Sequence, residues 1–72
     1  MNSRTQEQLT WIACHLMDGR QTGLISDVAK EFLISRPSAS KLVKRFISDG
    51  WLVASGSSHR PVYALGKNRV IS

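Results

Sequence analysis

Cations and hydroxyls alternate with apolar residues between positions 36 and 45. The side chains there that could neutralise or hydrogen-bond an anion are Arg36, Ser38, Ser40, Lys41, Lys44 and Arg45. Lysine and arginine neutralise phosphates or donate to guanine, and a serine hydroxyl both donates and accepts. A second polar group, Ser58, His59 and Arg60, follows farther along the chain. This chemistry favours a polyanionic partner.

The other reactive residues do not form a site. Cys14 and His15 are the pair that would suggest a nucleophile or a set of metal ligands. Adjacent residues of a helix point about 100° apart, so these two side chains do not face each other. A single cysteine also excludes an intramolecular disulfide framework and falls short of a multi-cysteine zinc site. We therefore expect no enzyme activity, no metal and no cofactor.

The charge of the chain is unevenly distributed. Ten Lys and Arg against five Asp and Glu give the 72 residues a net charge of +5. Residues 34–72 contain seven of the ten basic residues and a single acidic one, Asp49. This excess points to DNA, RNA or an anionic lipid surface, and charge alone does not choose among them.

The length and the apolar content are those of one small domain, 1–72. Apolar residues make up 42% of the chain, and no apolar run approaches the roughly 20 residues of a membrane span. The polar start of the sequence lacks the apolar segment of a secretory signal. Because nothing here needs oxidation, we expect a cytoplasmic protein without a membrane partner.

The first periodic stretch predicts an amphipathic helix over about residues 5–18, capped by Ser3 or Thr5 and ended by Gly19. Its apolar stripe is Leu9, Ile12, Ala13, Leu16 and Met17. Trp11 falls about 200° from Leu9 on the helical wheel, so we expect it to point away from the core, near Cys14. Trp11 and Cys14 are then candidates for a protein interface. The alternatives are a lone surface aromatic or one covered by the C-terminal tail.

Two further helices are predicted close together. Ser26 is a suitable N-cap for a helix over about 26–33, with Leu24 and Ile25 before it in a short strand or a hydrophobic staple. Ser35 is a suitable N-cap for a helix over about 36–49, which Gly50 ends. Its inward stripe is Ala39, Leu42, Val43 and Phe46.

After Gly50 the sequence becomes typical of strands. Two β-prone runs, 51–55 and 61–65, flank a polar loop, which predicts a hairpin over about 51–65 with Ser58, His59 and Arg60 at its tip. A basic tail, 67–72, follows. The order of elements predicts a mostly helical α+β fold with a C-terminal hairpin.

The helices predicted over about 26–33 and 36–49 are separated by only a tight turn, which is the spacing of a helix-turn-helix. The run from residue 28 to residue 46 resembles the winged helix-turn-helix DNA-binding domains, with the small residue Ala29 where that family packs its helices closely. The hairpin looks like the wing of MarR-like repressors, of IclR-like N-terminal domains and of small fimbrial phase-variation regulators. Leu33 replaces the usual glycine of the turn, so we expect the turn to be wider or strained there. Ser40 and Lys44 stand where Z-DNA-binding relatives have Asn and Tyr, which favours B-DNA.

The resemblance implies a sequence-specific double-stranded DNA-binding protein and a transcriptional regulator of bacterial or phage type. It assigns base contacts to Arg36, Ser38, Ser40, Lys41 and Lys44, phosphate contact to Arg45, and wing contact to Ser58, His59 and Arg60. The alternatives for these side chains are a solvated helix face and, for the serines, hydrogen bonding at the helix start.

Two other functions fit the same sequence features. One is a winged-helix module that binds proteins, and the other is a DNA-binding accessory of replication or recombination. We expect a homodimer or a regulatory protein as a further partner and no small-molecule effector. A DNA-bound form would lie on the nucleoid.

Overall fold

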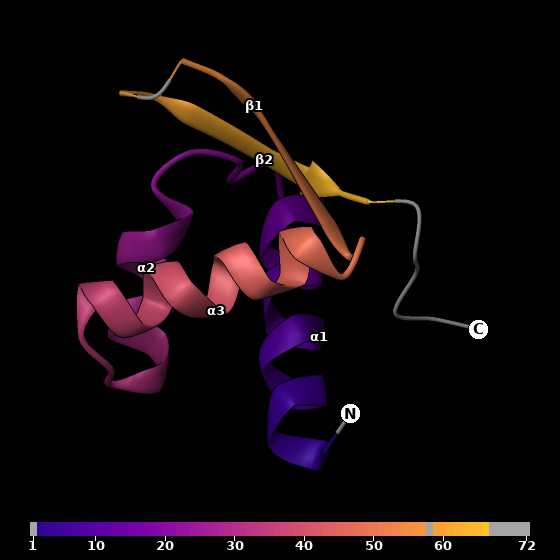
Figure 1. The fold of residues 1–72 in the computed structure, drawn as a ribbon, viewed down its shortest axis with the longest axis vertical. Helices are drawn as coiled ribbons and strands as arrows, with labels where there is room; N and C mark the ends of the chain where they lie inside the picture. Colours follow the sequence, from indigo (N-terminus) through magenta and orange to yellow (C-terminus); the bar gives the residue numbers. More distant parts are fainter. Residues whose placement is uncertain (1, 58, 67–72) are drawn as a thin grey trace.

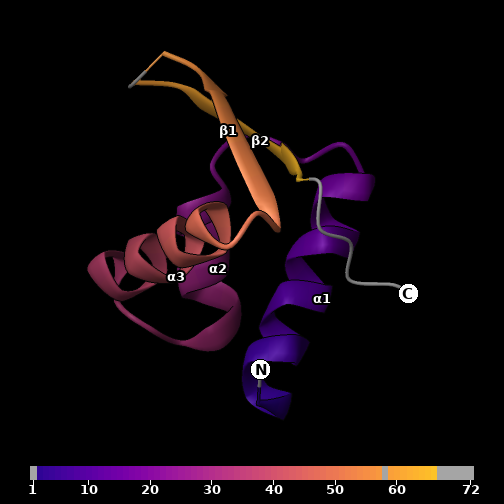
Figure 2. The same ribbon diagram turned by 45° about the vertical axis from the view of Figure 1, so that its right-hand side comes forward.

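The computed structural model describes residues 2–57 and 59–66. Three helices precede an antiparallel hairpin in this range: α1 (Ser3–Met17), α2 (Leu24–Phe32), α3 (Arg36–Ser48), β1 (Leu52–Gly56) and β2 (Pro61–Leu65). The helix α1 stands beside α2 and α3, and the hairpin lies next to α3 and the C-terminal end of α1, far from the start of α1 (Figure 1). The view turned by 45° shows the same arrangement (Figure 2).

These elements confirm the predicted α+β fold with a C-terminal hairpin. The predicted tail, 67–72, and the predicted tip residue Ser58 lie outside the described residues. None of the helices in the described range is both long and apolar enough to cross a membrane.

The starts of α1 and α3 are capped by side chains. The Ser35 hydroxyl accepts a hydrogen bond from the Ser38 N–H at 3.3 Å, which confirms the predicted cap of α3. At α1 the prediction was wrong by one residue or more, because Asn2 and not Ser3 or Thr5 is the cap. The Asn2 carboxamide oxygen accepts from the Thr5 N–H at 2.8 Å.

The helices α1 and α3 end at the predicted glycines. Gly19 and Gly50 have φ values of 88° and 85°, a region that glycine adopts without a Cβ clash. The N–H of the next residue then returns to a carbonyl of the last turn, as in the Trp51 N–H donating to the Phe46 carbonyl at 2.9 Å. This closed turn directs the chain from α3 into β1.

The predicted start of α2 was wrong by two residues. Its N-cap is Gly23, in the left-handed conformation, and Ser26 lies inside the first turn. Leu24 and Ile25 are therefore helical and form neither a strand nor a staple before the helix. The physical reason is burial: the Leu24 side chain is fully buried, which the helical conformation achieves.

The turn between α2 and α3 contains a strained residue. Leu33 has φ 54° and ψ 46°, the left-handed region that side chains with a Cβ rarely adopt. Its side chain is 91% exposed, so packing does not offset the strain. Of the two expectations for this turn, strain is the one confirmed.

The core fills the space between the three helices and the inner face of the hairpin. Its largest fully buried side chains are Phe46, Leu9, Ile12, Leu24, Leu52, Val28 and Val43. The strand register pairs Ala54 with Tyr63, and Tyr63 faces inward. The Tyr63 N–H donates to the Gln21 carbonyl at 3.0 Å, which joins the hairpin to the loop between α1 and α2.

Candidate nucleic-acid interface

The helix α3 presents its cations away from the core. Lys41, Lys44 and Arg45 are exposed, whereas Ser40 is half-buried. With about 100° between successive residues, Ser40 and Lys44 lie 40° and 80° around the helix from Arg36. Arg36, Ser40 and Lys44 therefore form one row along α3.

Two residues of α3 that were predicted to contact DNA, Arg45 and Ser38, do not belong to this row. Arg45 is about 180° around the helix from Arg36 and lines a different hollow, beside Asn2 and Thr5 of α1. The Ser38 hydroxyl accepts from the Ser35 hydroxyl at 3.0 Å at the start of the helix. Hydrogen bonding at the helix start, one of the alternatives for the serines, is thus what the structure shows for Ser38.

The tip of the hairpin carries two of the three predicted contacts within the described range. The side chains of His59 and Arg60 are exposed, and the Arg60 N–H donates to the Ser57 hydroxyl at 3.1 Å. This bond fixes the backbone just before β2. The hairpin therefore holds both side chains at a defined place beside the helices.

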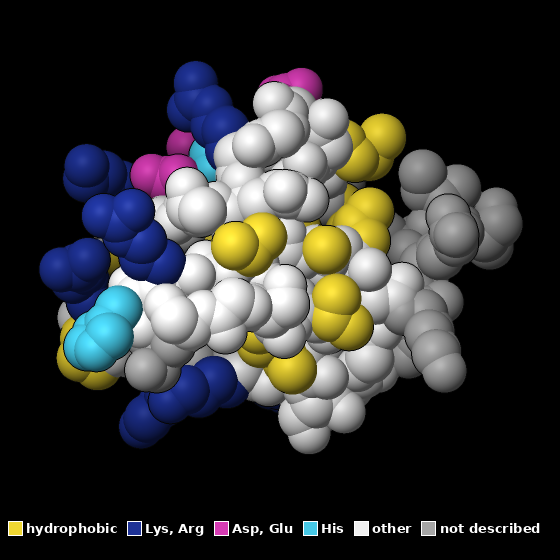
Figure 3. Space-filling view, turned by 90° about the horizontal axis from the view of Figure 1, so that it is seen from above, with side chains coloured by type: hydrophobic (Ala, Val, Ile, Leu, Met, Phe, Trp, Pro, Cys, Tyr) yellow, Lys and Arg dark blue, Asp and Glu magenta, His cyan; other side chains and the backbone are white. Residues whose placement is uncertain are grey.

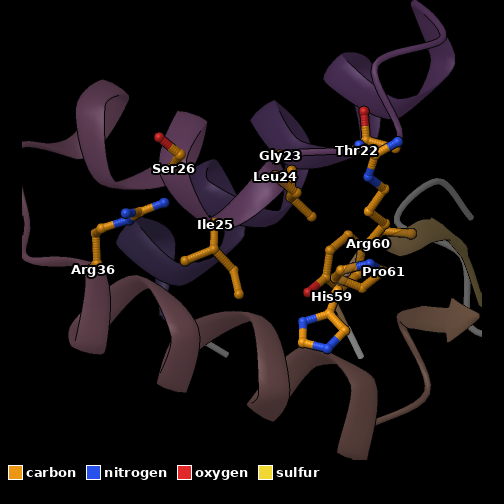
Figure 4. A pocket seen from close by; sticks show the side chains of 10 residues that line it. Thr22, Gly23, Leu24, Ile25, Ser26, Arg36, His59, Arg60 and Pro61 are labelled. Carbon is orange, nitrogen blue, oxygen red and sulfur yellow. The ribbon is translucent and has the colours of Figure 1, made fainter. Parts of the chain in front are cut away.

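A concave surface joins the hairpin tip to the helices. This α2–hairpin groove is formed by residues 22–26 at the start of α2, by Arg36, and by residues 59–61 and 63 of the hairpin. Its volume is about 420 Å³. Arg36 and Arg60 lie toward opposite ends of it, and Ile25 lies between them (Figure 4). The groove brings the predicted contacts Arg36, His59 and Arg60 together.

The groove is electrostatically positive. Its lining contains Arg36 and Arg60 and no aspartate or glutamate. Neither arginine forms an ion pair within the described part of the chain. The view from above the hairpin shows lysine and arginine side chains and a histidine gathered at one side of the molecule, with some acidic side chains next to them (Figure 3). An anion that enters the groove meets two arginines that no ion pair within the described residues neutralises.

Tyr63 and the first turn of α2 belong to this groove and were not predicted as site residues. Burial raises the pKa of the Tyr63 phenol above its ordinary value of 10.0. The groove is assembled from three separate segments, so no local spacing in the sequence marks it. The sequence contains one local signal of this site. Gly23 stands directly before the apolar pair Leu24 and Ile25, where it begins α2 without a capping side chain.

The expected outward orientation of Trp11 was wrong. The indole is half-buried, stacks on the His15 ring at 4.6 Å between centroids and meets the Phe32 ring edge-on at 5.6 Å. Phe32 belongs to α2, which packs against a side of α1 that the helical wheel of α1 alone assigns to solvent. Cys14 is exposed, as predicted.

His15 has a partner that the sequence did not reveal. Its Nε2 lies 2.8 Å from Asp27 Oδ2, across the interface between α1 and α2. The two residues are 12 positions apart, so no helical spacing links them. Among the described residues, no cluster of three or more His, Cys, Asp and Glu is placed to hold a metal.

Comparisons with protein-family models, with curated proteins and with solved structures gave no match to this chain.

Proposed function

We propose that this protein is a winged-helix DNA-binding protein that recognises a specific double-stranded sequence and regulates transcription. The observation that supports it most is the joint placement of Arg36 on α3 and of His59 and Arg60 on the hairpin around one positive groove. Two elements far apart in the sequence present cations to the same partner. A duplex has the matching shape, because its phosphates flank a major groove that admits a helix.

In the proposed complex, α3 enters the major groove along its exposed row. Lys44 and Arg36 donate to base edges or phosphates, and the half-buried Ser40 lies between them. His59 and Arg60 contact the backbone beside the helix. Lys41 lies about 60° farther around α3 than Lys44, so in this complex it contacts the opposite wall of the DNA major groove.

The structure lends less support to a protein-binding module. That alternative was based on an outward Trp11, and the indole packs on His15 and Phe32 instead. An accessory role in replication or recombination would use the same DNA-binding face. It differs in where the protein binds, which footprinting on promoter DNA separates.

The test is selection of bound sequences from a random duplex pool, followed by fluorescence anisotropy with the selected duplex. We expect binding that weakens with salt, with a slope of about −0.9 per phosphate neutralised. Lys44→Gln is expected to reduce the slope by about one phosphate contact. Arg4→Gln is the matched control, because it removes the same charge from the exposed start of α1, far from the hairpin.

Two results would contradict the proposal. The first is an absence of salt-dependent duplex binding by the unmodified protein. The second is an equal effect of Lys44→Gln and Arg4→Gln, because only net charge would then matter. Circular dichroism of each variant confirms that the helices are retained.

A further inference from the structure

The Tyr63 side chain is largely buried, but its hydroxyl remains accessible and has no partner within the described residues. The residue is only 5% exposed, and it lines the α2–hairpin groove. Its hydroxyl makes no hydrogen bond within the described part of the chain. Burial keeps the phenol protonated, since it raises the pKa, and a protonated phenol donates. Because the hydroxyl stays accessible and the side chain lines the groove, it is available to donate to a ligand bound there.

The start of α2 offers further donors to the same groove. Gly23 provides no capping side chain, and the first backbone bond of this turn is from the Asp27 N–H to the Gly23 carbonyl at 3.1 Å. The N–H groups of residues 24–26 therefore have no acceptor in the helix. The positive end of the helix dipole favours an anion here. The acidic residue of this turn, Asp27, is engaged with His15.

We infer that the α2–hairpin groove is a binding site for a phosphate group, with Tyr63 as its uncharged donor. Arg36 and Arg60 supply the positive charge toward the two ends of the groove, and Ile25 provides an apolar surface between them (Figure 4). Charged ends around an apolar middle match the alternation of phosphate and deoxyribose along a strand. This inference builds on the proposed function, in which the phosphate belongs to the DNA backbone. Free phosphate offers the same chemistry.

The first experiment uses inorganic phosphate and the isotopically labelled full chain. Phosphate is added at constant ionic strength, with chloride as the reference anion, and amide chemical shifts are followed by NMR. We expect saturable shifts at residues 24–26 and at least about fivefold weaker binding in Tyr63→Phe, which keeps the ring and removes the hydroxyl. Equal shifts in chloride, or equal phosphate affinity in Tyr63→Phe, would overturn the inference.

The second experiment measures duplex affinity for the same variant. Tyr63→Phe is expected to weaken binding of the selected duplex about fivefold with an unchanged salt slope, since no charge is removed. Arg60→Gln is expected to weaken it more than the matched Arg4→Gln. As a second groove variant, Arg60→Gln changes an exposed side chain and does not depend on how Tyr63→Phe packs.

The two proposals fail in different ways. Duplex binding that is weakened in Lys44→Gln but unchanged in Tyr63→Phe, with no saturable phosphate shifts at residues 24–26, would overturn the phosphate site and leave DNA binding standing. Phosphate binding in the groove without any duplex binding would support the site, identify free phosphate as its source and overturn the proposed function.

Discussion

Replacing Leu33 by glycine removes the strain in the turn between α2 and α3. The residue has φ 54° and ψ 46°, a conformation that costs a residue with a Cβ about 1–2 kcal/mol. Glycine adopts it freely but loses roughly 0.5–1 kcal/mol more backbone entropy on folding. The side chain is 91% exposed, so its removal sacrifices little packing. The expected net gain in the free energy of unfolding is about 0.5–1 kcal/mol.

Thermal denaturation followed by circular dichroism measures this gain. For a domain of this size, we expect the melting temperature of Leu33→Gly to rise by roughly 2–8 °C. The control is Leu33→Ala, which removes the same exposed side chain but keeps the Cβ and therefore the strain. Its stability should stay within about 0.5 kcal/mol of the original. Equal stability of the glycine and alanine variants would refute the strain in this turn.

Three further predictions concern capping, pairing and pH. Ser35→Ala removes the cap of α3 and is expected to cost about 1 kcal/mol in urea denaturation, whereas an unchanged midpoint would mean that the cap contributes nothing. Asp27→Ala deprives the partly buried His15 ring of its partner and should lower the free energy of unfolding by about 1 kcal/mol, measured in the same way, with Glu31→Ala on the same helix as a control. Because burial raises the pKa of Tyr63 above 10.0, its ionisation favours the unfolded chain. Stability is therefore retained below pH 10 and falls as the pH rises through the folded-state pKa. The difference between the urea midpoints at about pH 8 and about pH 11 should therefore be smaller in Tyr63→Phe than in the unmodified protein. An equal drop in the midpoint between these pH values in both proteins would contradict this.

The features predicted correctly from the sequence are local ones. Ser35 caps α3 because a serine hydroxyl reaches an N–H only three residues away. Gly19 and Gly50 end their helices because the backbone requires a residue that tolerates positive φ. Both signals act within a few positions, so they can be recognised without knowledge of the fold.

The features predicted wrongly depend on distant packing. Ser26 has the chemistry of a cap, yet burial of Leu24 extends α2 past it to Gly23. Trp11 is off the apolar stripe of α1, yet Phe32 of α2 covers it. A helical wheel describes one helix, and it does not contain the neighbour that decides exposure.

The candidate site was predicted in part. The exposed cations of α3 follow from helical periodicity, and the position of His59 and Arg60 follows from the hairpin. The groove that joins them, and the largely buried Tyr63 side chain that lines it, depend on how the hairpin packs over the start of α2. That contact connects residues about 40 positions apart in the chain.

The most direct test of the account is to map the DNA contact on the protein. The isotopically labelled chain is titrated with its selected duplex, and amide shifts are followed by NMR. The account predicts that the largest changes lie in the exposed row of α3, at the hairpin tip and at residues 24–26. Changes centred on the exposed side of α1 around Cys14, or no change with any selected duplex, would contradict it.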